Sequence, residues 1–473
     1  MNMRPIWRAQ RLSVAAGLAV AAASATAQCR NPIWTSDFSA PGSGVGLFTK
    51  AITVFDPDGP GPMPEELYVA GSFQSAGGVA GTRGIAKWNG QAWSSVGGGL
   101  TSASSIDGMC VFDLDGNGPA SPVLAVVGTF TQIGGVPANR MAFWDGVQWT
   151  APASGYTTEL ITTVKIIEFD ADGAGPLRPV LVALGEPTIW PGPELMAWDG
   201  QSWSPLPDPG AVASVCMAQF DEDGDGPAPP KLFLGIKSSP GILRLDGSSW
   251  EVVGGGLNIR SGVYKADAMA VIDEDGPGPE RPRLWVGGFF NEAGTTPALG
   301  LARWDGSSWQ PGPGNPNFYG SVMHSIASID YSNGLGAPDI FVMRSTTIDR
   351  WNRATGTWSV AGQVQLWDPS IRRTIQEYRS PTEAVPSMYV MGGWVDFNGV
   401  PAQNIARYKC DPCYPNCDGS TGGPVLSASD FQCFFLAVAN NLPWANCDSS
   451  TGTPALTAND FLCFMNKFAA GCS

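Results

Sequence analysis

The chain has 473 residues, of which 42 are acidic and 27 basic, giving a net charge of −15. This charge argues against nucleic acid and anionic membrane surfaces as partners and leaves divalent cations as candidate ligands. The 60 glycines and 40 prolines accompany a hydrophobic content of 43%, which disfavours disorder and is typical of many short strands joined by tight turns.

The first 27 residues have the features of a signal peptide. Three arginines precede an apolar run from Leu12 to Ala23, and Ala25-Thr26-Ala27 fits a cleavage site. The run is shorter than the ~20 residues that a membrane span needs, and no later segment reaches that length. The sequence therefore predicts a secreted protein, extracellular or at the cell surface, with residues 1–27 removed and no membrane span.

Residues 28–410 repeat a unit of roughly 50 residues, as repeat architectures do. Each copy has a strand ending in Phe-Asp or Ile-Asp, a Gly/Pro turn, a strand such as Leu67–Phe73, and a hairpin such as Trp144–Trp149. Asp-Gly in the hairpin suits a positive φ, because glycine has no Cβ to clash. Four short strands per copy predict an all-β fold, a β-propeller of about seven four-stranded blades.

The seventh copy lacks a fourth strand with its tryptophan, and Ile33-Trp34-Thr35-Ser36 near the N-terminus supplies the missing piece. Pairing this segment with the strand ending at Tyr408 would close the last blade and remove an exposed sheet edge. Cys29 precedes one strand and Cys410 follows the other, so we predict a Cys29–Cys410 disulfide in the oxidising environment outside the cell. The other repeated tryptophans are expected to pack between blades.

The repeat resembles kelch-type propellers and, more closely, the Gly-Gly-x-Phe and Trp-Asp-Gly repeats of secreted fungal polarity-marker propellers and of bacterial exported proteins. Leu284–Phe289 and Ala302–Gly306 carry the likeness. Such a resemblance implies the fold and says little about function.

Five copies share the turn Asp-x-Asp-Gly-x-Gly-Pro after the first strand, as at Asp56/Asp58 and Asp221/Asp223. Two interpretations are open. The aspartates cap their own tight turns, or the paired carboxylates bind calcium weakly, because calcium prefers oxygen ligands. The absence of a regular third acid favours capping.

Residues 411–473 differ from the repeat because they are rich in cysteine and hold a tandem duplication, Asn416–Phe434 and Asn446–Phe464. Each copy is predicted to form a loop with oxygen-bearing side chains at alternate positions, followed by a short helix, Phe431–Ala439 or Phe461–Ala469. The pattern predicts a small α-helical domain that depends on disulfides, metal or both for stability.

The duplication resembles a dockerin pair, specifically the cysteine-containing version at the C-termini of exported bacterial proteins. The resemblance implies EF-hand-like calcium loops with ligands at Asn416, Asp418, Ser420, the Val425 carbonyl, Ser427 and Asp430, and at Asn446, Asp448, Ser450, the Ala455 carbonyl, Thr457 and Asp460. It also implies a partner for the tail, a cohesin-like or other cell-surface protein. Asparagine replaces the usual aspartate at the first position of both loops, so a disulfide-stapled helical hairpin without metal is the alternative.

The single histidine, His324, argues against His-based triads and multi-histidine metal centres, and we expect it to be packed or to line the channel. Cys110 and Cys216 are expected to be buried thiols. No catalytic motif is present, so we predict a non-catalytic binding or structural module displayed through its tail. The alternative is a carbohydrate-active hydrolase or lyase, which a buried acid pair in the central funnel would favour.

The loops that join strands two to three and four to one share one face of a propeller. We expect aromatic side chains there to bind a polysaccharide or an envelope protein. The alternative is that these rings pack under their own loops. The residues are Tyr156, Trp190, Tyr264, Phe318, Tyr319, Trp394 and Phe397.

Overall fold

The computed structural model describes residues 32–410 with gaps, together with 428–439 and 457–470. The gaps are 41, 47, 60, 117–120, 156–160, 173–177, 188–194, 211–213, 225, 259–264, 332–335, 354, 367–372, 382, 384 and 398–399. The predicted signal peptide, residues 1–27, lies outside the described residues. Neither helix in the described ranges has the length and apolar character that crossing a membrane requires.

Four-stranded antiparallel sheets follow one another along the chain. The first five are β2 (Thr49–Phe55), β3 (Glu66–Gly71), β4 (Ile85–Trp88) and β5 (Trp93–Ser95); β6 (Ile106–Phe112), β7 (Val123–Gly128), β10 (Met141–Trp144) and β11 (Trp149–Thr150); β12 (Ile161–Phe169), β13 (Val180–Pro187), β14 (Leu195–Trp198) and β15 (Trp203–Pro205); β16 (Ser214–Phe220), β17 (Lys231–Ile236), β18 (Ile242–Asp246) and β19 (Ser249–Val252); and β21 (Lys265–Ile272), β22 (Arg283–Phe289), β25 (Leu301–Trp304) and β26 (Trp309–Pro311).

Two further sheets complete the series. One joins β27 (Met323–Ile329), β28 (Asp339–Arg344), β29 (Thr347–Asn352) and β30 (Thr357–Leu366), and is extended by β33 (Trp394–Phe397) and β34 (Val400–Pro401). The other joins β31 (Thr374–Tyr378), β32 (Ser387–Met391), β35 (Ile405–Cys410) and β1 (Pro32–Trp34). Short ladders in the loops are formed by β8 (Gln132–Ile133), β9 (Val136–Pro137), β20 (Leu257–Asn258), β23 (Glu292–Ala293) and β24 (Thr296–Pro297).

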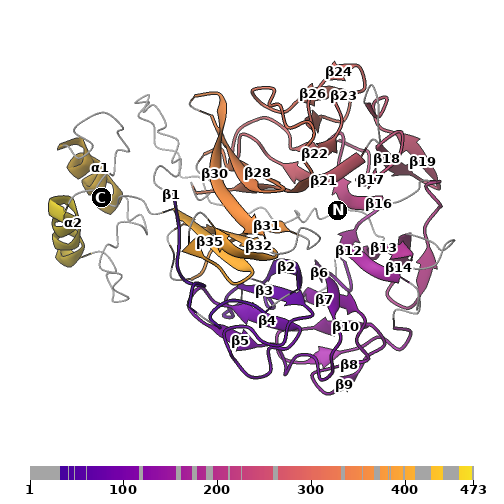
Figure 1. Cartoon of the computed structure of the whole chain (residues 1–473), viewed down its shortest axis with the longest axis horizontal. Coiled ribbons are helices and arrows are strands. Elements are labelled where there is room, and N and C mark those ends of the chain that lie inside the picture. The colour runs from indigo at the N-terminus through magenta and orange to yellow at the C-terminus, as the bar shows by residue number, and fades with distance from the viewer. Residues whose placement is uncertain are drawn as a thin grey trace, which may run out of the picture.

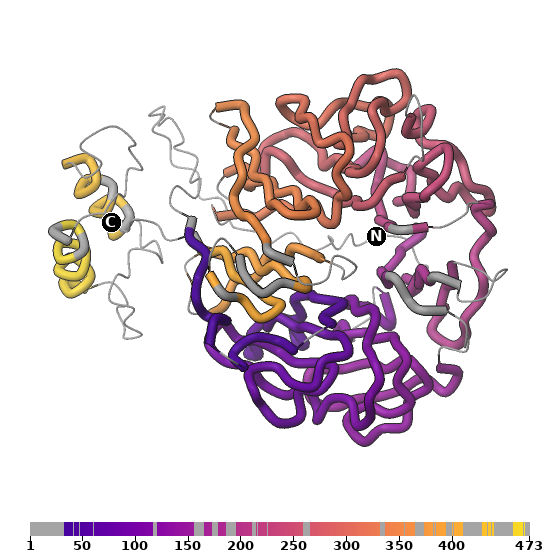
Figure 2. Tube along the Cα trace, in the orientation of Figure 1, coloured from indigo at the N-terminus to yellow at the C-terminus, as the bar shows by residue number. Residues whose placement is uncertain are grey.

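The first strands of these sheets contact one another in a closed cycle (Figure 1). β2 contacts β6, β6 contacts β12, β12 contacts β16, β16 contacts β21, β21 contacts β27, β27 contacts β31, and β31 returns to β2. Figure 2 shows the tube passing round the molecule, so that its orange strands lie beside its indigo start. The prediction of a mostly β fold built of four-stranded, propeller-like blades is confirmed.

The N-terminal strand β1 is the outermost strand of the last sheet, as predicted. Trp34 lies opposite Tyr408 in the β1–β35 ladder, and the two rings are 4.7 Å apart. The Trp34 Nε1–H donates to the Ala361 carbonyl in the preceding sheet at 2.9 Å. The backbone of Cys410 pairs with Pro32. Cys29 lies outside the described residues, so the Cys29–Cys410 disulfide stays a prediction.

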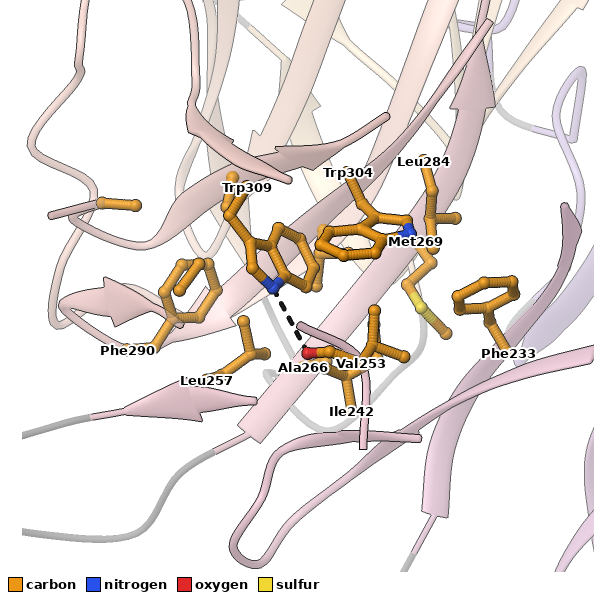
Figure 3. Packing of buried hydrophobic residues seen from close by; sticks show 14 of the residues in the cluster. Phe233, Ile242, Val253, Leu257, Ala266, Met269, Leu284, Phe290, Trp304 and Trp309 are labelled. Carbon is orange, nitrogen blue, oxygen red and sulfur yellow. Dashed lines mark hydrogen bonds between the residues drawn. The ribbon is translucent and has the colours of Figure 1, made fainter. Parts of the chain in front are cut away.

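Tryptophans connect most of the sheets to the one before them. In the hairpin that ends a blade, Trp304 and Trp309 lie 5.1 Å apart, and the Trp309 Nε1–H donates to the Val253 carbonyl at 3.3 Å (Figure 3). A buried indole N–H needs such an acceptor. The same bond recurs from Trp93 to Ser43, Trp149 to Val96, Trp250 to Pro207 and Trp358 to Pro313. The predicted packing of tryptophans between blades is confirmed.

Glycine follows the fourth strand because the next tryptophan pair leaves no room for a side chain. Gly254 has a φ of +52°, and a Cβ there would lie 2.4 Å from Cζ3 of Trp304. Gly97 has the same conformation and would meet Trp144 at 2.6 Å. The backbone therefore needs glycine both for its positive φ and for the close approach.

Helices α1 (Ala428–Ala439) and α2 (Ala458–Ala470) begin one turn before the predicted starts at Phe431 and Phe461. For α2 the cause is a reciprocal cap: the Asn459 N–H donates to Thr457 Oγ1 at 3.2 Å, and the Thr457 N–H donates to the Asp460 carboxylate at 2.6 Å. The helices contact through Phe434 and Phe464, whose buried rings stack 4.2 Å apart.

Candidate functional site

A pocket of about 500 Å³ lies on the axis of the cycle of first strands. Its walls come from β2, β6, β12, β16, β21, β27 and the start of β31, with Lys237, which directly follows β17. The volume is within the range of about 300–1,000 Å³ that small-molecule sites occupy. Because the lining residues lie at the starts of first strands and the end of a second strand, the pocket is on the face predicted to bind a ligand.

β-Bulges lie along the first strands where they line this pocket. The ladder register shifts by one residue at Lys50, Asp107, Asp267 and His324. The same shift occurs in β12 and β16. A bulge leaves one residue out of the ladder and re-aims its side chain. Here four of the bulge residues are titratable side chains that line the pocket.

Apart from His324, sequence reasoning missed these residues. Lys50, Asp107, Asp267 and His324 all stand at the same offset before the Phe or Ile that ends their strand. Polar residues recurring at one offset in otherwise apolar strands were the available signal. Their convergence depends on ring closure, which no single strand reveals.

The pocket is positively charged in an acidic protein. Four of its lining side chains are cationic and two are anionic, a balance of +2, whereas the whole chain carries −15. Clefts with low-dielectric walls focus the field of such charges. The cations are Lys50, Lys165, Lys237 and Arg373, and the anions are Asp107 and Asp267.

Both acids are held by lysines. Lys50 Nζ lies 2.5 Å from Asp107 Oδ1, which also accepts the Ser105 hydroxyl at 2.7 Å. Lys265 Nζ lies 2.9 Å from Asp267. Burial raises the pKa of Asp267, and Lys265 opposes that shift only in part.

His324 lines the pocket and is neutral. Its Nε2 lies 2.9 Å from a guanidinium nitrogen of Arg373, and arginine can only donate, so Nε2 accepts the hydrogen bond. Burial, with Arg373 and Lys265 nearby, lowers the pKa of His324 to about 4. Arg373 is 3% exposed and also donates to the Ser345 carbonyl at 2.7 Å.

We expect the His324 imidazole to titrate near pH 4 in the native protein. The folded pKa is below the unfolded value of about 6.5, so the unfolded chain binds the extra proton between these limits. The His324 contribution to stability is therefore complete above pH 6.5 and is lost as pH falls towards 4. Because this is the only histidine, its NMR resonance is unambiguous.

The control is His324→Gln, which removes the histidine titration and leaves the titrating carboxyl groups in place. Glu377, whose pKa burial raises to about 7, acts in the opposite direction, so the difference between wild type and variant isolates His324. A native His324 that titrates near pH 6.5 would contradict the expectation.

Cys216 and Cys110 are free cysteines in the described part of the chain. Cys216 is buried and lines the pocket, and its thiol lies 3.4 Å from the Ala266 carbonyl. Burial raises the pKa of Cys216 to about 12 and raises that of Cys110 as well. Neither thiol is therefore an activated nucleophile at neutral pH.

The Asp-x-Asp-Gly turns cap themselves. Asp221 Oδ1 accepts the N–H groups of Asp223 and Gly224 at 3.2 and 3.0 Å, and Asp223 Oδ2 accepts the Ala228 N–H at 3.0 Å. Burial and the adjacent Asp223 carboxylate raise the pKa of Asp221. The capping interpretation is confirmed. Across the described residues, no group of three or more His, Cys, Asp or Glu is arranged to hold a metal, and weak calcium binding at these turns stays a prediction.

The aromatic residues predicted to bind a ligand differ in their exposure to solvent. Phe318 is buried against Trp358, with the Arg344 guanidinium 4.8 Å from its ring centre, so its ring packs under its own loop. Tyr319 is 41% exposed and lies beside Phe289. Trp394 and Phe397 belong to β33. Tyr156, Trp190 and Tyr264 lie outside the described residues.

Three of the predicted calcium ligands fall within the described helices and caps. Asp430 and Asp460 are fully buried, and the Asp460 carboxylate caps α2 through Thr457. Cys463 is disulfide-bonded. The remaining predicted ligands lie outside the described residues: Asn416, Asp418, Ser420, Val425, Ser427, Asn446, Asp448, Ser450 and Ala455.

No protein-family model and no curated protein matches the chain. Solved structures that resemble it include the extracellular domain of the one component system BT4673 from B. thetaiotaomicron, with 10% identity and a TM-score of 0.45 over 82% of this chain and 42% of that one. The GH74 enzyme of Niastella koreensis has 13% identity and a TM-score of 0.43 over 78% and 44%. The six-bladed fungal lectin of Aleuria aurantia has 15% identity and a TM-score of 0.32 over 69% and 96%. The chain thus spans less than half the length of the first two.

Proposed function

We propose that the protein is an exported, non-catalytic binding module of seven propeller blades, anchored in an extracellular or cell-surface assembly by a dockerin-like tail. The observation that carries the anchoring role is an apolar face on α1 and α2. The ring supports the binding role through the ligand-sized pocket on its axis.

Seven blades are proposed because the cycle of first strands has seven members, from β2 to β31. Trp34 supports the same count, since it takes the place of the fourth-strand tryptophan in the last sheet and donates to the sheet before it. The repeated Gly-Gly-x-Phe and Trp-Asp-Gly motifs, which resemble those of secreted propellers, agree with this architecture.

The tail face consists of Phe435, Leu436, Leu462 and Met465, whose exposed fractions are 53%, 57%, 60% and 37%. Phe435 and Met465 occupy equivalent positions in the duplication, one residue after the buried Phe434 and Phe464. Large apolar side chains gathered on the surface of so small a unit indicate a docking site. A cohesin-like or other cell-surface protein is the proposed occupant.

Calcium is the proposed ion of the loops that precede the helices. Asp430 and Asp460 are buried carboxylates at the loop ends of α1 and α2, next to segments rich in oxygen-bearing side chains. Oxygen donors of this kind suit calcium. The Asp460 carboxylate also caps its helix, so an ion held there would order the loop and the helix start together.

A carbohydrate-active hydrolase or lyase is the second candidate, because the axial pocket holds Asp107 and Asp267, and burial raises the pKa of Asp267 as a general acid requires. The lysine pairs of both acids favour the binding module, since they stabilise the charged carboxylates. Release of reducing ends from acidic polysaccharides, lost in Asp267→Asn, would establish the enzyme instead.

The mature chain should be retained on the cell envelope of its source, and Phe435→Ser with Leu462→Ser should weaken retention about tenfold or more, since central apolar anchors dominate docking energies. The measurement is a cosedimentation titration. The melting temperature of the propeller should stay unchanged, because both substitutions lie in the tail helices α1 and α2. Chelation of calcium should reduce retention in the same way.

The matched control is Val147→Ser, which removes a side chain that is 74% exposed on the ring. It should leave retention unchanged. If the double variant is retained as well as the wild type, the tail face is not the anchor. If the chelator alone has no effect, the tail docks without calcium.

A further inference from the structure

The axial pocket has a second property, its charge, that the anchoring role does not explain. Lys50, Lys165, Lys237 and Arg373 come from four different segments of the chain yet line one cavity. Gathering like charges costs Coulomb energy, and the acids in the same cavity neutralise only half of them. Since the rest of the chain is strongly acidic, a general basic composition does not explain this concentration.

Arg373 and Lys165, two of the positive groups, are held in place by the fold. Arg373 is 3% exposed, and its guanidinium is fixed by the Ser345 carbonyl and by His324 Nε2 at 2.7 and 2.9 Å. The Lys165 ammonium donates to the Met217 carbonyl at 2.9 Å. Pre-ordered cations lose little conformational entropy when they bind a ligand, which is the condition for specific recognition.

The remaining walls are apolar, with Ile52, Met109, Ile166, Met269 and Ile375 among the lining residues. A bare inorganic ion would not use these walls, whereas an organic molecule with a charged group would contact both parts. The volume of about 500 Å³ accommodates a ligand of monosaccharide to disaccharide size.

We propose that the axial pocket binds a small organic anion, with its carboxylate or phosphate group held by the cations that line the pocket, Lys237 and Arg373 among them, and the body of the ligand against the apolar walls. This inference rests on the proposed binding role of the propeller and is independent of the tail. Both carboxylate and phosphate satisfy the same cations.

His324 provides the readout. Its imidazole contacts Arg373, and an anion beside that guanidinium would offset the positive charge that disfavours the imidazolium. Ligand binding should therefore shift the single histidine resonance and raise the pH at which it titrates. Arg373 and Lys265 are the charged groups that act on this histidine. The other charged groups that line the pocket are Lys50, Asp107, Lys165, Lys237 and Asp267.

The experiment titrates the full mature chain with galacturonate, glucose 6-phosphate and neutral glucose, followed by the His324 resonance and by calorimetry. One or both anions should bind, and glucose should not. The anion that binds more tightly shows whether the pocket prefers a carboxylate or a phosphate group. Lys237→Met should weaken anion binding about tenfold, the effect of losing one charged hydrogen bond.

Lys87→Met is the control, because Lys87 is a partly buried lysine of the ring that pairs with Glu66 at 2.5 Å and is not among the pocket residues. It should leave affinity unchanged. The inference is overturned if no anion shifts His324 at millimolar concentration, or if Lys87→Met and Lys237→Met weaken binding equally. If glucose binds as tightly as the anions, the anion inference fails, but the proposal that the propeller is a binding module stands. The envelope-retention experiment tests the tail separately.

Discussion

Trp309→Ala is expected to lower the free energy of unfolding by about 3–5 kcal/mol, the usual cost of truncating a buried aromatic residue. Trp309 is 7% exposed and packs with Trp304 in a core shared by two adjacent sheets (Figure 3). The substitution leaves a cavity between β16–β19 and β21–β26 and removes the hydrogen bond to Val253. Denaturant unfolding followed by tryptophan fluorescence and circular dichroism measures the loss.

Trp309→Phe separates the two contributions of this side chain. It keeps an aromatic ring in the core and removes the indole N–H. We therefore expect Trp309→Phe to lose less stability than Trp309→Ala, with about 1 kcal/mol of its loss due to the missing hydrogen bond. Val147→Ala, at an exposed surface position, should change stability by less than about 0.5 kcal/mol. Equal effects of Trp309→Ala and Val147→Ala would show that tryptophan does not hold adjacent blades together.

Arg407→Met should cost about 3–5 kcal/mol, because it leaves a buried carboxylate without its partner. The Arg407 side chain is 8% exposed and that of Glu383, with which it pairs, is 9% exposed. Arg407 also binds Asp37 at 2.9 Å and Ser387 Oγ at 3.1 Å. It therefore ties the segment after β1 to the last sheet, and its loss should lower the melting temperature cooperatively.

Two variants test the origin of that loss. Adding Glu383→Gln to Arg407→Met should recover part of the stability, since the buried charge disappears with its partner. Lys87→Met disrupts a more exposed pair, with side chains 24% and 15% exposed, and should cost only about 0–1 kcal/mol. If Arg407→Met costs no more than Lys87→Met, the Arg407 network does not hold the ring closed.

Local sequence patterns determined the strands, the hairpins and the closing role of Trp34. Those features depend on local rules. A tight turn with positive φ favours glycine, and a half-buried strand alternates apolar and polar residues. A blade that lacks its fourth strand needs one from elsewhere in the chain. Because the unit is repeated, each copy tests the interpretation of the others. The Trp34–Tyr408 pairing was predictable for this reason.

The axial pocket was decided only by the tertiary structure. Lys50, Asp107 and Asp267 lie far apart in sequence, and each could equally have been an ordinary surface residue of its strand. The bulges place them in one cavity, and a bulge arises where the ladder register must change, which depends on the partner strand rather than on the residue itself. The start of α2, in contrast, follows from a local signal that sequence reasoning missed, because Thr457 and Asp460 three residues later form a reciprocal cap. Sequence determines which elements form, whereas the closed ring determines which of their polar side chains meet.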